Sequence, residues 1–218
     1  MSVIYRGPTR SYELTDTDVL WLARGFVGEH GEKCTRFEAS ALFASWMDRF
    51  LLVNGPWLKS GQDFSELLRA HSQPLNPIWA DPGSAKCLKY PQYCTPKDIK
   101  RRKRISSLSK TQLAKYGVWE FAVDAQQGRL SRPIQESCYD FAAASLVEKQ
   151  KRPCNGINLE GTRYLTYDCL KVSEQKGVVD QHAQVYIAAS ATTVGIVGGA
   201  LAVGVGAFLS YLFSKLTE

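Results

Sequence analysis

The chain has 218 residues, of which 44% are hydrophobic and 22% are charged, so it can form one globular domain with a short appendage. The formal net charge of +6 lies almost entirely before Gly177 and suits a polyanionic partner: nucleic acid, anionic lipid or the acidic polymers of a bacterial envelope. The 3 histidines are scattered and no CxxC or HxxxH motif occurs, so we expect no metal site and no cofactor.

Two helices are predicted near the amino terminus. Thr15 followed by Asp18 forms a capping pattern, which predicts a helix that ends near Gly28. Thr35 followed by Glu38 repeats the pattern. The apolar residues after it recur at helical spacing, so we expect a second, amphipathic helix there.

The next elements follow the same kind of signal. A shorter helix is predicted over residues 63–71, then a proline-rich loop over 72–83. Thr95 and Pro96 begin another helix, and residues 109–127 predict one long helix that Gly128 ends. Residues 156–172, with Glu160-Gly161 as a turn, are the best strand candidate. The predicted fold class is therefore α+β, mainly helical with a small β element.

The 6 cysteines are an even number, which permits disulfides. We expect at least one structural disulfide, with Cys87–Cys94 and Cys154–Cys169 as the candidates. Plain buried thiols are the alternative.

The densest cluster of positive charge lies within the helix that is predicted to begin at Pro96. A solvated helix face, or attraction to an anionic wall or lipid headgroup, explains this cluster, because it has no interleaved aromatic residues. We therefore do not expect a nucleic-acid partner. A membrane-anchored nucleic-acid-binding protein is the least favoured of three functional hypotheses, and the other two are given below. The cluster consists of Lys97, Lys100, Arg101, Arg102, Lys103 and Arg104.

Residues 187–213 are apolar and long enough to predict one C-terminal transmembrane helix. A buried core helix is the alternative. The predicted organisation is a domain at 1–180, followed by a membrane helix and a short tail at 181–218. Small residues on one face of that helix predict self-association or packing on another membrane protein. They include Gly195, Gly199, Ala202 and Gly206.

Glu29 is the candidate catalytic residue. It lies where the first predicted helix ends, and the negative end of the helix dipole disfavours its ionised form. Shielding by nearby aromatic side chains would raise its pKa further, as glycosidic-bond cleavage by a general acid requires. Gly28 and Gly31 would let a bulky substrate approach the backbone. The alternative is a surface residue in a helix-ending loop. The aromatic residues are Trp21, Phe26 and Phe37.

The segment "WLARGFVGEHGE" and the following "EASALFASWMDRF" resemble the cell-wall hydrolase family of the spore-cortex-lytic (SleB) type, including its bacteriophage relatives. Ala23-Arg24, Gly28-Glu29 and Arg49 match the family pattern, whereas Asp48 stands where asparagine is usual. Two later segments match in the same order, "LLRAHSQPLNPIW" and "AVDAQQGRLSRPIQESCYDFAA".

The resemblance implies a lysozyme-like domain that acts on peptidoglycan, with Glu29 as the acid. It implies a lytic transglycosylase, in which one glutamate protonates the glycosidic oxygen and then closes an anhydro ring, or else a glycosidase that uses water. Ser72, Gln73 and Asn76 would hydrogen-bond the glycan, and Trp79 or Tyr139 would stack on a sugar. Asp140 would complete the substrate-binding set.

The amino terminus has no apolar segment of a secretory signal, and Lys171 and Lys176 would keep the domain on the cytoplasmic side of a membrane. Delivery by a virus particle would resolve this conflict with a peptidoglycan substrate. We therefore expect a virion protein that opens the wall during phage genome delivery, located in the host envelope or an internal virion membrane. Its small-residue face would then pack on other virion proteins or on a second copy of the chain. The alternative is a non-enzymatic, membrane-inserting virion protein with a hydrolase-like scaffold.

Overall fold

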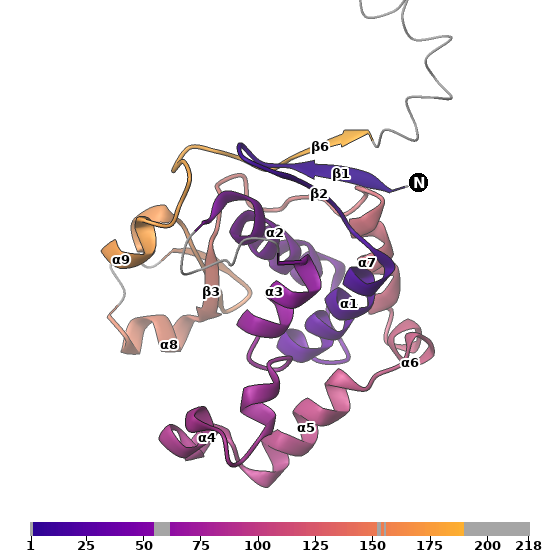
Figure 1. Ribbon diagram of the computed structural model, residues 1–218, viewed down its shortest axis with the longest axis vertical. Coiled ribbons are helices and arrows are strands. Elements are labelled where there is room, and N and C mark those ends of the chain that lie inside the picture. Colours follow the sequence, from indigo (N-terminus) through magenta and orange to yellow (C-terminus); the bar gives the residue numbers. More distant parts are fainter. Residues whose placement is uncertain (1, 55–61, 152–153, 155, 190–218) are drawn as a thin grey trace, which may run out of the picture.

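A computed structural model describes residues 2–54, 62–151, 154 and 156–189 (Figure 1). Helices dominate it, and two small sheets lie at its edges. The elements in chain order are β1 (Val3–Arg6), β2 (Ser11–Glu13), α1 (Asp16–His30), α2 (Arg36–Leu52), α3 (Phe64–His71), η2 (Pro77–Ala80), α4 (Ala85–Lys89), η3 (Pro91–Tyr93), α5 (Pro96–Ser106), α6 (Lys110–Lys115), α7 (Val118–Gln126), β3 (Asp140–Ala143), α8 (Ala144–Lys149), β4 (Ile157–Leu159), β5 (Thr162–Leu165), η4 (Tyr167–Cys169), α9 (Val172–Gln175) and β6 (Tyr186–Ala189).

The predicted helix starts are confirmed, because local capping groups fix them. Thr15 and Asp18 form a reciprocal capping box at the start of α1. Thr35 and Glu38 form the second box, at the start of α2. The buried faces of α1, α2, α3 and α7 then share one apolar core, which includes Leu22, Phe26, Leu42, Trp46, Phe50, Phe64, Leu67 and Ala122.

Two predicted helix boundaries are wrong. Helix α1 continues to His30, so Glu29 lies in its last turn and the chain turns away only at Gly31, whose φ is 83°. The predicted long helix at 109–127 is two helices, α6 and α7. Gly117 separates them, and its left-handed φ of 76° breaks the α-helical path in a way that glycine tolerates best.

The β structure is more extensive than predicted. The predicted strand region is confirmed in its first part, where β4 and β5 flank the Glu160-Gly161 turn, and β3 pairs with β5 to complete one antiparallel sheet. The prediction is wrong beyond Leu165, where the chain forms η4 and begins α9. The second sheet has the order β2-β1-β6, with Tyr5 opposite Tyr12 and Ile187. In Figure 1 this second sheet lies across one end of the helical core.

The predicted fold class is wrong in including a C-terminal transmembrane helix. Residues 186–189, which include the start of the apolar segment, form strand β6 on the edge of a sheet. Within the part of the chain that the structure describes, every helix is too short or too polar to cross a bilayer. The remainder of the predicted span lies outside the described residues, and so does its small-residue face, which includes Gly195, Gly199, Ala202 and Gly206.

Both candidate disulfides are confirmed. Cys87 and Cys94 are bonded, with 5.4 Å between their Cα atoms, and Cys154 is bonded to Cys169. Cys34 and Cys138 are buried thiols, and burial raises the pKa of each to about 12, so neither is a reactive thiolate.

Candidate active site

A cleft of about 430 Å³ lies between the helical core and the sheet formed by β3, β4 and β5. Its helical wall comes from the end of α1, from α2 and from the loop that begins at the end of α3. Its other wall comes from β3, α8 and the turn between β4 and β5. The polar and aromatic lining includes Glu29, His30, Trp46, Arg49, His71, Gln73, Asp140 and Phe141.

Glu29 reaches this cleft from the last turn of α1 and is half-buried. Burial raises the pKa of its carboxyl group to about 7. A hydrogen bond from Ser72 and the charge of Arg101 oppose this shift, whereas the nearby Asp140 carboxylate adds to it. The side chain is therefore protonated in a large fraction of molecules near neutral pH, as a general acid requires.

The contact between Glu29 and Ser72 depends on a glycine. The Ser72 hydroxyl donates a hydrogen bond of 2.6 Å to the Glu29 Oε1 atom. A Cβ atom at Gly28 would lie 2.8 Å from the Cβ atom of Pro74, so only glycine lets the loop after α3 approach α1 this closely. Gly28 is buried in this contact with Pro74 and does not face a substrate.

A second carboxylate lines the same cleft, from the opposite wall. Asp140 is the first residue of β3, and its Oδ1 atom lies 3.5 Å from the Arg49 Nη1 atom. The same oxygen accepts a hydrogen bond of 2.9 Å from the Phe141 amide. A neighbouring guanidinium group and an N–H donor both favour the ionised form of a carboxylate. The cleft thus combines a carboxyl group that is partly protonated near neutral pH with a second carboxylate that is paired with a guanidinium group.

Aromatic side chains form the apolar part of the cleft. Trp46 packs edge-on against Phe141, with ring centroids 5.7 Å apart, and stacks on Phe26 at 6.2 Å. Of the three aromatic residues expected to shield Glu29, only Phe26 contributes to this group. Trp21 lies under the guanidinium groups of Arg24 and Arg69, and Phe37 is 43% exposed.

The structure brings some predicted substrate-binding residues together and separates others. Ser72, Gln73 and Asp140 join Glu29 at the cleft. Asn76 instead caps η2 through Ile78 and donates to the Ala70 carbonyl.

Neither of the two predicted stacking residues is placed to stack on a sugar, although Tyr139 belongs to the cleft lining. Trp79 packs between Tyr90 and Tyr93, outside the cleft lining. The Tyr139 side chain is fully buried, so in this structure its ring presents no face to a sugar.

Two other residues that belong to the family motifs, Arg24 and Asp48, stabilise the fold and do not line the cleft. Arg24 donates twice to the Leu108 carbonyl, at 3.1 and 3.0 Å, and so joins α1 to the loop between α5 and α6. Asp48 is completely buried and pairs with Arg132, away from the cleft. The aspartate therefore supports the fold at the position where the family usually has asparagine.

Comparisons with protein-family models, with curated proteins and with solved structures were made for the chain. None of them gives a match. Within the described residues, no group of three or more His, Cys, Asp or Glu side chains is placed to hold a metal ion. A function for this chain is therefore inferred from the cleft itself and from the resemblance of its motifs.

The hydrogen bond from Ser72 gives a prediction about pH dependence. This bond lowers the pKa of Glu29, so Ser72→Ala should raise that pKa above about 7. Because a general acid works only while protonated, activity should persist to higher pH in the variant. The measurement is the pH profile of any cleavage of peptidoglycan, the substrate that the resemblance implies. Ser72→Thr keeps the hydroxyl group and should retain the wild-type profile, and an unchanged profile in Ser72→Ala would contradict the assignment.

Proposed function

We propose that this protein cleaves the glycan strand of peptidoglycan, with Glu29 as the general acid. The observation that carries the proposal is a carboxyl group with a pKa of about 7 in a cleft that also holds a second carboxylate. The order of the motifs that resemble cell-wall hydrolases supports the choice of substrate.

The reaction begins with proton transfer from Glu29 to the glycosidic oxygen while the bond from that oxygen to the sugar ring breaks. The ring then carries positive charge, which the Asp140 carboxylate stabilises electrostatically. Arg49 holds Asp140 in place through its ion pair. Gln73 and His71 line the same cleft and are within the region where sugar hydroxyls would bind.

The second step restores the acid. Glu29, now a carboxylate, removes a proton from the group that attacks the sugar ring. That group is either water or the sugar's own hydroxyl, which closes an anhydro ring without consuming water. The two outcomes differ in mass by one water molecule.

The test is to incubate the full chain with purified peptidoglycan and to analyse the soluble fragments by mass spectrometry. We expect soluble muropeptides with a new glycan end, whose mass identifies the attacking group. Release of free peptides with intact glycan strands would contradict the proposal, because it would mean that a different bond is cut. If no fragment is released, the non-enzymatic scaffold becomes the better explanation.

We also propose that the enzyme acts from a bacteriophage particle and opens the wall locally during genome delivery. The resemblance to the bacteriophage relatives of the hydrolase family supports this setting. The corresponding measurement is whether purified particles contain the chain. Particles that lack it would contradict the setting without affecting the proposed reaction.

A further inference from the structure

Residues 77–106 form a compact projection, called here the basic knob, which contains η2, α4, η3 and α5. In Figure 1 it extends from the helical core at the end opposite the β2-β1-β6 sheet. The Cys87–Cys94 disulfide closes its short loop. Arg101 lowers the pKa of Glu29, but none of the knob's residues lines the Glu29 cleft, so the proposed reaction leaves most of the knob without a role.

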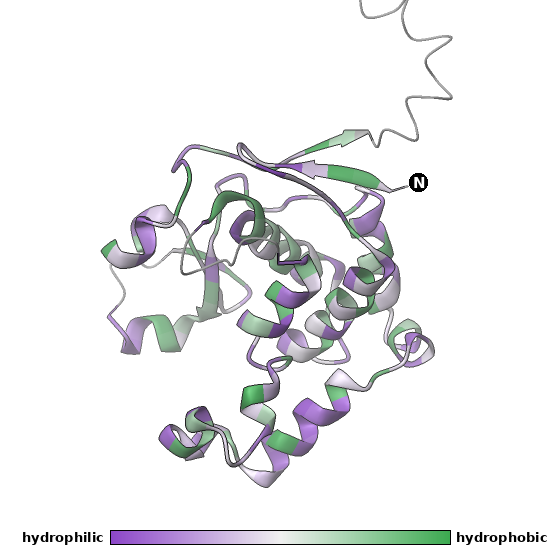
Figure 2. Ribbon diagram, in the orientation of Figure 1, coloured by the Kyte–Doolittle hydropathy of each residue, from purple (hydrophilic) through white to green (hydrophobic). Residues whose placement is uncertain are grey.

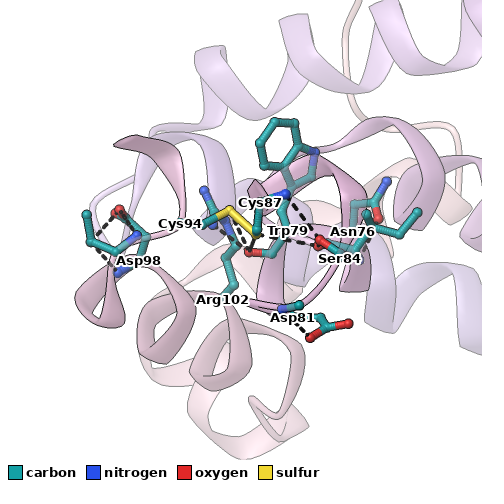
Figure 3. Close-up of a disulfide and its surroundings, with 11 residues drawn as sticks. Asn76, Trp79, Asp81, Ser84, Cys87, Cys94, Asp98 and Arg102 are labelled. Atoms are coloured by element: carbon teal, nitrogen blue, oxygen red, sulfur yellow. Dashed lines mark hydrogen bonds between the residues drawn. A yellow bond between two sulfur atoms is a disulfide. The ribbon is translucent and has the colours of Figure 1, made fainter. Parts of the chain in front are cut away.

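The interior of the knob is well packed. The Trp79 ring lies 6.1 Å from the ring of Tyr90 and 6.4 Å from the ring of Tyr93. Arg102 is buried, lies over the Trp79 ring and donates a hydrogen bond of 2.7 Å to the Trp79 carbonyl (Figure 3). One cation of the predicted basic cluster is therefore structural, and it fixes α5 against η2.

The other cations of the knob face solvent. The knob contains eight Lys or Arg residues and two Asp residues, so its net charge of +6 equals that of the whole chain. Figure 2 shows α5 as strongly hydrophilic along most of its length. The exposed cations are Lys86, Lys89, Lys97, Lys100, Arg101, Lys103 and Arg104.

The knob also exposes large apolar side chains. Leu88 is 71% exposed, Ile78 is 48% exposed and Tyr93 is 47% exposed. They come from α4, η2 and η3, which contact one another within the knob. Exposed aliphatic side chains gain nothing from a soluble polyanion, whereas they gain free energy by entering the boundary between lipid headgroups and acyl chains.

We propose that the basic knob binds the surface of an anionic lipid bilayer. Its lysines attract the headgroup phosphates, and Leu88, Ile78 and Tyr93 insert at the interface. Arg101 donates a hydrogen bond of 2.9 Å to the Gly28 carbonyl, next to Glu29. Binding through the knob would therefore hold the cleft at a fixed position relative to the bilayer. This inference does not depend on the proposed glycan cleavage.

The experiment measures binding of the full chain to vesicles of phosphatidylglycerol and phosphatidylcholine, with pure phosphatidylcholine vesicles for comparison. The triple variant Lys97→Glu, Lys100→Glu and Lys103→Glu should bind the anionic vesicles about 100-fold more weakly. Wild-type binding should fall as salt is added. The matched control reverses three exposed lysines outside the knob, Lys115, Lys149 and Lys176, and should lose much less affinity.

A single apolar substitution separates a lipid surface from other polyanions. Leu88→Ser should weaken vesicle binding about tenfold and leave binding to heparin or duplex DNA unchanged. Val172→Ser is the control, because Val172 is also 71% exposed but lies in α9. Equal losses in the two triple variants would overturn the proposal. So would an unchanged affinity of Leu88→Ser for vesicles, or binding to heparin or DNA without binding to anionic vesicles.

Discussion

Glu29→Gln should reduce glycan cleavage by about 1,000-fold, because it removes the proton donor and changes little else. Glutamine has nearly the same shape as protonated glutamate, and its amide oxygen can still accept the 2.6 Å hydrogen bond from Ser72. The variant should therefore keep its melting temperature. The measurement is the rate at which soluble fragments are released from purified peptidoglycan, at a pH near 7.

Glu32→Gln is the matched control for this experiment. Glu32 lies just after the end of α1, is exposed, and pairs with Arg104 outside the cleft. The same chemical change at this position should leave the rate of cleavage within about twofold of wild type. The assignment of Glu29 fails if the two variants are equally active, or if Glu29→Gln loses activity only because it unfolds.

The sequence predicts the helix starts well because the signals are local. Thr15 and Asp18 lie three residues apart and satisfy each other's hydrogen bonds once the first turn forms. The same holds for Thr35 and Glu38. No distant contact is needed to decide these boundaries, and a short segment of sequence is sufficient.

Elements that depend on distant partners were not predicted. Strand β6 exists because it pairs with β1, almost the whole chain away, so a composition of small and apolar residues could equally predict a helix. The break at Gly117 was missed for a different reason. The apolar spacing continues through 109–127, and only the left-handed conformation of this one glycine separates α6 from α7.

In the candidate site, too, some features can be predicted from the sequence and others depend on the complete fold. Motif order identified Glu29, Ser72, Gln73 and Asp140, which the structure places at one cleft. The pairing of Asp140 with Arg49 cannot be derived from the sequence, because the two residues are 91 positions apart and either residue alone suggests a surface charge. Tyr139 cannot stack on a sugar in this structure because its side chain is buried. The sequence does not predict this, because the burial of one aromatic side chain depends on the complete fold.

Arg132→Ala should destabilise the protein by about 3 kcal/mol, the largest loss that we expect from one surface-accessible side chain. The Arg132 guanidinium group binds both carboxylate oxygens of the fully buried Asp48 and also donates to the Ile134 and Glu136 carbonyls. Asp48 accepts a further hydrogen bond of 2.9 Å from the Cys138 amide. Together these contacts tie α2 to the segment that leads into β3.

Removal of Arg132 leaves a buried carboxylate with one remaining donor. Burial already raises the pKa of Asp48 while the hydrogen bonds from Arg132 oppose the shift, so the pKa should rise further in the variant. Folded Asp48 then binds a proton more readily than unfolded Asp48 does. The destabilisation relative to wild type should therefore shrink as the pH is lowered from the raised pKa of Asp48 toward the unfolded value of about 3.9. Denaturant unfolding at several pH values measures both effects.

Two comparisons make the result specific. Arg129→Ala removes one of the two arginine partners of Asp124 and leaves Arg36 in place. Because the Arg129 side chain is 58% exposed, the substitution should cost about 1 kcal/mol or less. Adding Asp48→Asn to Arg132→Ala removes the uncompensated charge, so the double variant should be more stable than Arg132→Ala alone. If Arg132→Ala costs no more than Arg129→Ala, the buried pair does not stabilise the fold.

Since the pair fixes the segment that carries Asp140, its loss should also lower the rate of glycan cleavage, even at temperatures below the unfolding transition.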